Sequence, residues 1–248
     1  MRRALAVLVA AAALAAPPLR AQRVRATGWG AYEGVTGSQD WTTAGAQLTL
    51  TGARGHAVWL AGEVLGRFGE TNVSGRAGIT LHPAPRWWIT LESGAAAEPT
   101  FVPKNTWEVD VTALATSRAS VGLAYRRWNY VVGPVDIVIP HVTLQTRDVS
   151  LDARLYVSRN PSRRTDAAFT LRATLPVSAR TAVSLLGGGG RESYLVGAEV
   201  RSLETLTGVV GVRHNAGGGF TLRADAIVIR SRPVLSRRGI AVGIAREL

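Results

Sequence analysis

The stretch Phe220-Thr221-Leu222-Arg223-Ala224-Asp225-Ala226-Ile227-Val228 decides the fold. Every second residue of this stretch is apolar. Thr221, Arg223 and Asp225 separate the first four of these apolar residues. Because successive side chains of a β-strand point to opposite faces, the stretch predicts a strand with one apolar and one charged face. Such a strand fits a soluble sandwich, whose polar face meets water, or a membrane barrel, whose polar face lines a wet lumen.

The same alternation recurs along nearly the whole chain, with turn residues between the segments. The segments span about 43–51, 58–68, 72–81, 87–92, 107–113, 121–126, 138–147, 151–158, 169–175, 182–190, 206–212, 220–228 and 240–248. They predict an all-β fold, a closed antiparallel transmembrane β-barrel of about fourteen strands, with twelve as the alternative, because single-chain barrels use even numbers. The glycines at 187–190 are expected to end a strand or form a turn, and residues 191–204 to be an outer loop or a strand extension.

Three details favour a membrane barrel over a sandwich. Charges of both signs lie in the middle of the segments, as an enclosed wet lumen allows when they pair. Trp41, Trp87 and Trp107 lie at segment ends, where aromatic girdles meet lipid headgroups. The chain also ends on a strand, which can pair with the first and remove both sheet edges. Pro140 lacks a backbone donor and is expected at a bulge.

The alternation assigns one face to lipid and the other to the lumen. The lipid-facing set contains Leu48, Leu60, Ile79, Leu91, Val111, Leu123, Leu144, Leu155, Leu171, Leu222 and Ile244. The candidate lumen network contains Glu63, Arg67, Arg76, Glu92, Asp110, Arg126, His141, Asp152, Arg154, Arg172, Arg223 and Asp225, and the same phase includes Glu108 and Arg147. We expect cross-strand contacts between the arginines and the carboxylates of this network.

The N-terminus predicts export. Arg2 and Arg3 precede an apolar run over 4–16, two prolines interrupt it, and Ala21-Gln22 is a plausible cleavage point. This is the layout of a secretory signal peptide, and a run of this length is too short for a transmembrane helix. We therefore expect a removable signal peptide over 1–21, a barrel over 22–248, and a place in the outer membrane of a Gram-negative envelope. The chain has no cysteine and can form no disulfide.

Charge and composition restrict the partners. The formal charge is +12 for the whole chain, and removal of Arg2, Arg3 and Arg20 with the signal leaves +9. The arginines are dispersed and the chain is exported, which argues against nucleic acid. The expected partners are outer-membrane lipid and the barrel assembly machinery. Outer-membrane barrels usually end in Phe or Trp, whereas this chain ends in Leu248. The sequence does not identify a solute.

Catalytic and cofactor motifs are weak. His141 is predicted to face the lumen, with Asp152 and Ser150 on the neighbouring segment, but a triad needs mutual distances of about 3 Å. His56, His82 and His214 show no metal-ligand spacing. The sequence contains no nucleophile elbow, no P-loop and no dinucleotide fingerprint. We therefore expect no cofactor and no enzyme activity, with His141 in a lumen hydrogen-bond network.

Several functions are compatible with this pattern. The lumen charges either brace a narrow barrel through ion pairs or line a pore with a mild preference for anions. A structural or passive-transport outer-membrane barrel is the favoured interpretation. The alternatives are a barrel enzyme acting on lipid or glycan, and a soluble periplasmic β-protein that binds a small molecule.

Short motifs resemble those of the YaiO family of outer-membrane β-barrel proteins. They are Arg67-Phe68-Gly69, Leu81-His82-Pro83, Phe101-Val102-Pro103, Tyr125-Arg126 and the run Asp152-Ala153-Arg154-Leu155-Tyr156. The resemblance covers most of the chain from about Gly66 onward. It implies an outer-membrane barrel, and it does not imply a catalytic site.

Overall fold

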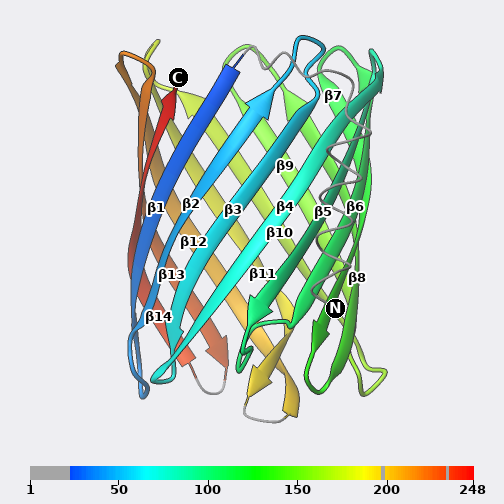
Figure 1. Ribbon diagram of the computed structural model, residues 1–248, viewed down its shortest axis with the longest axis vertical. Coiled ribbons are helices and arrows are strands. Elements are labelled where there is room, and N and C mark those ends of the chain that lie inside the picture. The colour runs from blue at the N-terminus through cyan, green and yellow to red at the C-terminus, as the bar shows by residue number, and fades with distance from the viewer. Residues whose placement is uncertain (1–22, 197–198, 233–234) are drawn as a thin grey trace.

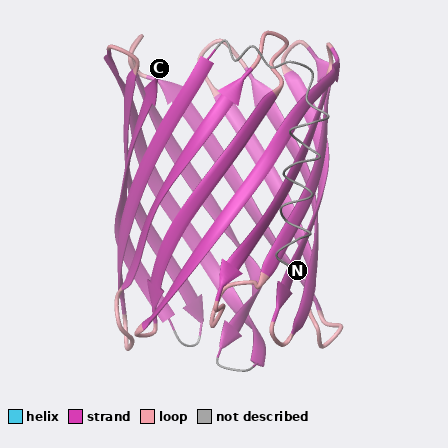
Figure 2. Cartoon of the chain, in the orientation of Figure 1, coloured by secondary structure: helices cyan, strands magenta, loops and turns pink. Residues whose placement is uncertain are grey.

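A computed structural model describes residues 23–196, 199–232 and 235–248. The expected signal peptide, 1–21, lies outside these residues. The described chain consists of fourteen β-strands joined by short connections (Figures 1 and 2). They are β1 (Arg23–Val35), β2 (Trp41–Thr51), β3 (Ala57–Arg67), β4 (Glu70–Ala84), β5 (Trp87–Ala97), β6 (Asn105–Thr116), β7 (Ala119–Tyr130), β8 (Gly133–Gln145), β9 (Ser150–Arg159), β10 (Thr165–Pro176), β11 (Thr181–Val196), β12 (Glu199–Gly217), β13 (Phe220–Arg232) and β14 (Leu235–Glu247).

The strands close into one antiparallel barrel. Each strand pairs with its neighbours in sequence, and β1 pairs with β14, with Gly30 opposite Val242. Closure gives every strand two partners, so the backbone groups are paired within the sheet, as a bilayer requires. The expectation of a closed fourteen-stranded barrel is confirmed, and the twelve-stranded and sandwich alternatives are wrong. The described residues contain no helix long and apolar enough to cross a membrane.

The outer wall is the apolar phase of the alternation. Leu60, Leu123 and Leu171 are more than half exposed on the outside, at 64%, 55% and 51% of their full accessibility. Register places the lipid-facing residues opposite one another, as in the pairs Leu48–Leu60, Ile79–Leu91, Val111–Leu123 and Leu222–Ile244. An outer wall of paired aliphatic side chains is the surface that hydrocarbon favours.

Three local expectations are wrong or only partly right: those for the tryptophan girdle, for Pro140 and for the glycines at 187–190. Trp41 does not join an outer girdle but is buried in the lumen, whereas Trp87 and Trp107 are exposed. Pro140 lies at no bulge: pairing of β8 with β9 lapses beside it and resumes in the same register at His141. A missing proline donor therefore costs ladder bonds without shifting the strand.

The glycines at 187–190 lie inside β11 rather than at its end. A Cβ on Gly190 would lie 2.3 Å from the carbonyl oxygen of Ala167 on β10, and Gly190 has φ of +140°. Glycine is required here because the two backbones approach closely and the angle disfavours other residues. Beyond it, the strand-extension alternative for 191–204 is correct, since β11 continues to Val196 and β12 begins at Glu199.

The two ends of the lumen differ. β1 begins and β14 ends at the same end, which we name the termini end (Figure 1). At the opposite end, the plugged end, inward side chains are buried: Val35, Trp41, Leu65, Asn72, Val135, Ile137, Ala168 and Arg237. On the termini side, the lumen-phase arginines Arg23, Arg25 and Arg213 are exposed. Inward side chains are thus exposed near the termini and buried at the plugged end.

Candidate functional site

A belt of four charges crosses adjacent strands of the lumen wall. Arg76 on β4 lies 3.5 Å from Glu92 on β5, measured from Nη1 to Oε1. Arg126 on β7 donates its Nε–H to Glu108 on β6. Glu92 and Glu108 are register partners, so the two carboxylates lie side by side between two arginines. The order of charges is positive, negative, negative, positive, and each carboxylate has its own cation.

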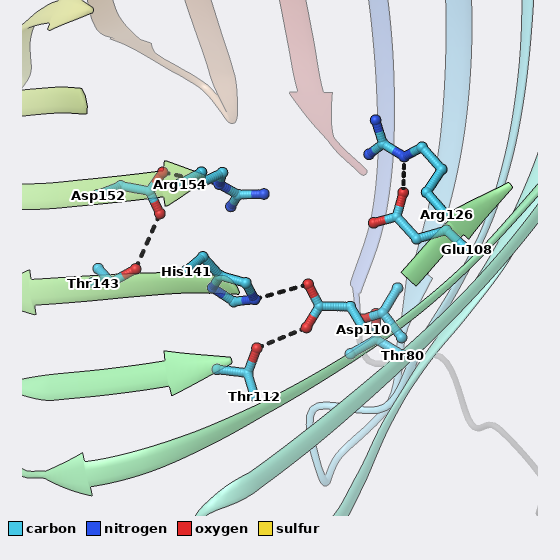
Figure 3. Close-up of polar contacts among 10 residues, drawn as sticks. Thr80, Glu108, Asp110, Thr112, Arg126, His141, Thr143, Asp152 and Arg154 are labelled. Atoms are coloured by element: carbon cyan, nitrogen blue, oxygen red, sulfur yellow. Dashed lines mark hydrogen bonds and ion pairs between the residues drawn. The ribbon is translucent and has the colours of Figure 1, made fainter. Parts of the chain in front are cut away.

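His141 pairs with Asp110, two strands away. Its Nε2 lies 3.1 Å from Asp110 Oδ2, and Thr112 donates a hydrogen bond of 2.8 Å to Asp110 Oδ1 (Figure 3). The imidazole crosses the intervening strand at Gly122, where a Cβ would lie 2.3 Å from its Cε1. The small residue on β7 therefore allows the contact between β8 and β6.

Asp152 belongs to a separate group on β8 and β9. Thr143 donates to its Oδ2 at 3.1 Å, and Arg154 Nε lies 3.0 Å from its Oδ1 (Figure 3). The Ser–His–Asp arrangement considered from the sequence is wrong. His141 contacts Asp110 instead of Asp152, and Ser150 is the register partner of Gln145, four residues from His141 along β8. The arrangement is a network of ion pairs and hydroxyls rather than a nucleophile with its base.

The other members of the candidate network are spread around the lumen. Ser74 donates to Glu63 at 3.1 Å, and Arg223 Nε lies 2.7 Å from Asp225 Oδ2 on the same strand. Arg172 is the register partner of Asp152 but makes no ion pair within 4.0 Å among the described residues. Arg147 lies in the connection between β8 and β9, outside the belt.

Arg67 lies away from the belt, at the plugged end. Its Cζ is 4.5 Å from the centroid of the Trp41 ring, and Arg237 Cζ is 4.4 Å from the same ring. Arg237 Nη1 in turn lies 3.2 Å from Glu33 Oε2. The sequence pattern does not predict that Glu33, Trp41 and Arg237 belong to the lumen network. The signal is weak in β1, where glycines at 28, 30 and 34 occupy the phase that large apolar residues mark elsewhere.

A charged group on β7 and β8 faces outward. Tyr125 donates a hydrogen bond of 2.5 Å to Asp136, and Arg127 Nη1 lies 3.5 Å from the same carboxylate. The Tyr125 ring also packs against the Trp107 ring in a tilted arrangement, with the ring centroids 4.9 Å apart. Pairing and aromatic cover allow these charges on the outer wall, where isolated ions are costly.

The remaining histidines form no metal centre. His56 Nδ1 accepts a hydrogen bond of 3.0 Å from the backbone of His82, whose ring packs on Trp88 at 4.9 Å. Among the described residues, no three His, Cys, Asp or Glu side chains come together as metal ligands would. The lumen chemistry visible in this part of the chain is therefore ionic and hydrogen-bonding.

The sequence matches no protein-family profile and no curated protein. Solved structures resemble its fold. A monoaromatic hydrocarbon channel, CymD, gives a TM-score of 0.63 at 8% identity, covering 91% of this chain and 88% of that one. The Acinetobacter baumannii outer membrane protein Omp33 gives 0.56 at 10% identity, covering 92% and 100%. An anion-selective porin from Comamonas acidovorans gives 0.50 at 11% identity, covering 91% and 98%. The chain has the fold of an outer-membrane β-barrel.

Proposed function

We propose that the protein is an integral barrel of the outer membrane that serves as a narrow passive pore. The observation that carries this function is the combination of a charged lumen with an apolar outer wall in one closed sheet. An apolar wall is stable against lipid hydrocarbon, and a polar lumen can hold water and small solutes.

Ion pairing supports a braced, narrow lumen. The pairs Arg76–Glu92 and Arg126–Glu108 connect neighbouring strands, and their side chains are 16% to 38% exposed. Partly buried pairs of this kind hold side chains in fixed positions, because separating the partners would leave a partly buried charge unpaired. The lumen wall is thus polar, and its paired side chains take up part of the lumen. This restricts passage to small solutes.

The similar proteins include a hydrocarbon channel and an anion-selective porin. Passage is the common theme of these names, and it supports passive transport here. We infer that outer-membrane lipid and the barrel assembly machinery are the partners of this chain. The lumen network is better suited to bracing than to catalysis. The hydroxyl next to the His141–Asp110 pair belongs to Thr112 and donates to the Asp110 carboxylate, whereas a catalytic nucleophile would donate to the imidazole.

We further infer that the chain is related to the YaiO barrels. Two of the motifs that carry the resemblance meet at the plugged end, where Arg67 lies 5.7 Å from the Phe101 ring and Phe68 lies 6.2 Å from it. Contact between motifs that are distant in sequence gives a physical reason for their joint occurrence.

Reconstitution into liposomes tests the pore function. Swelling in isotonic solutions of sugars of increasing size should reveal slow entry of the smallest sugars and exclusion of the larger ones. Entry no faster than in protein-free liposomes would contradict a pore and leave a structural role. A protein that remains in solution without detergent would contradict the membrane assignment itself.

A further inference from the structure

A compact group of side chains lies in the lumen at the plugged end. We name it the Trp41 cluster, and it consists of Glu33, Trp41, Arg67, Phe101 and Arg237. These residues come from β1, β2, β3, the connection between β5 and β6, and β14. The cluster therefore joins the first and last strands of the barrel to a connection between two later strands.

Charge is unbalanced in this cluster. Two guanidiniums lie over one indole, at 4.5 Å and 4.4 Å from the ring centroid. Glu33 pairs with Arg237 at 3.2 Å, whereas Arg67 has no carboxylate within 4.0 Å among the described residues. Cation–π contact offsets part of the cost of burying a guanidinium, but it supplies no counter-charge.

Two buried donors in the cluster lack acceptors. Trp41 is 5% exposed, and its Nε1–H finds no partner in the described part of the chain. The Nε–H of Arg67 is buried and also finds none there. Buried polar groups are nearly always hydrogen-bonded. Two such donors, one of them on a guanidinium without a carboxylate within 4.0 Å among the described residues, indicate a place for an acceptor with negative charge.

The aromatic surroundings hold this arrangement in place. Phe68 packs edge-on against Trp41 at 5.2 Å and against Phe101 at 6.2 Å. Its backbone has φ of +55°, a left-handed conformation that a bulky residue adopts at a cost. Packing of Phe68 on both rings offsets that cost and keeps the indole fixed beside Arg67.

We propose that the Trp41 cluster is a binding site for a small oxyanion of the carboxylate or phosphate class. The anion accepts hydrogen bonds from Arg67 and Trp41 and lies directly against Arg67, whereas the short ion pair of Glu33 is with Arg237. Guanidinium forks suit planar and tetrahedral oxyanions, and such charge-assisted bonds are strong when partly buried. This inference goes beyond the pore function, because binding in detergent requires no conduction.

Tryptophan fluorescence of the whole purified barrel provides the test. Iodide quenches an indole on contact, so iodide at constant ionic strength should quench one saturable fraction of the emission, and phosphate or acetate should reverse it. Trp41→Phe should remove that fraction, although six other tryptophans remain of the seven. Arg67→Gln should weaken the binding of iodide and of phosphate about tenfold, which is equivalent to about 1.4 kcal/mol of binding free energy.

Matched variants keep the result interpretable. Arg172→Gln removes another lumen guanidinium without a carboxylate partner in the described chain and should leave the saturable fraction unchanged. Arg67→Lys retains the charge and guards against misfolding of the glutamine variant. It should bind phosphate better than Arg67→Gln. Quenching that rises linearly, ignores phosphate and acetate, and is equal in wild type and Arg67→Gln would overturn the anion site, whatever the liposome experiment gives.

Discussion

At the scale of single residues, the lumen network depends on the absence of a side chain at Gly122. The His141 imidazole occupies the space that a Cβ would take, 2.3 Å from its Cε1, and Thr112 Oγ1 lies 2.8 Å from the same point. Gly122→Ala should therefore push His141 off Asp110 and destabilise the barrel by about 1–3 kcal/mol. Thermal unfolding in detergent measures the effect.

Two further variants separate this clash from a general effect of alanine. Gly208→Ala places a methyl where nothing lies within 4 Å, and it should change stability little. Combining Gly122→Ala with His141→Ala should cost less than the two separate losses together, because the clashing ring is gone. Additive losses would contradict the contact.

The pair Arg126–Glu108 offers a second residue-scale prediction. Removing the cation in Arg126→Gln leaves Glu108 beside Glu92 without its partner, so the loss of stability should exceed that of the double variant Arg126→Gln/Glu108→Gln. Denaturant unfolding of the single and double variants measures the coupling, expected at about 1–3 kcal/mol. Equal stability of Arg126→Gln and the double variant would show that the ion pair does not stabilise the barrel.

At the scale of a strand, the alternation of β2 predicts opposite effects for adjacent positions. Leu48 is 46% exposed on the outer wall, whereas Thr49 is half-buried on the lumen side. Leu48→Arg should cost up to about 2–4 kcal/mol because it brings a charge into hydrocarbon, and Thr49→Arg should cost far less in a wet lumen. Folding titrations into lipid vesicles compare the two variants, and a reversed order would invert the assigned faces.

The strands also show how far the sequence could lead. Two-residue alternation predicts the faces of β2, β3 and β13, because apolar residues mark one phase over most of each strand. It fails for β1, where small residues occupy the outer phase, and for the glycines of β11, whose role depends on the approach of β10. The bulge predicted at Pro140 also fails. A strand paired with two neighbours tolerates one missing backbone donor without a shift in register.

Side-chain partners are harder to predict than faces. The polar phase identified Asp110, His141 and Asp152 as inward residues, but it could not tell that His141 reaches two strands away over Gly122. The position of Trp41 at a strand end predicts a place in an outer girdle, because strand ends often carry one. Its burial follows from the meeting of β1, β3 and β14 at the plugged end, a contact that only the closed barrel brings about.

At the scale of the whole molecule, the barrel is a polar vestibule that narrows to a plug. Exposed arginines line the termini side, paired charges cross the middle, and buried aromatic and apolar side chains fill the plugged end. A chain built this way resists flow at one layer rather than along its entire length. Changes at the plug should therefore alter conduction much more than changes elsewhere on the wall.

Single-channel recording in planar bilayers tests this account most directly. The wild-type barrel should give small conductance steps, and Trp41→Ala should raise them several-fold by opening the plugged layer. Trp87→Ala, which removes an indole exposed at 47% on the outer wall, should leave the steps unchanged. Large wild-type steps that Trp41→Ala does not alter would contradict a pore narrowed at the plugged end.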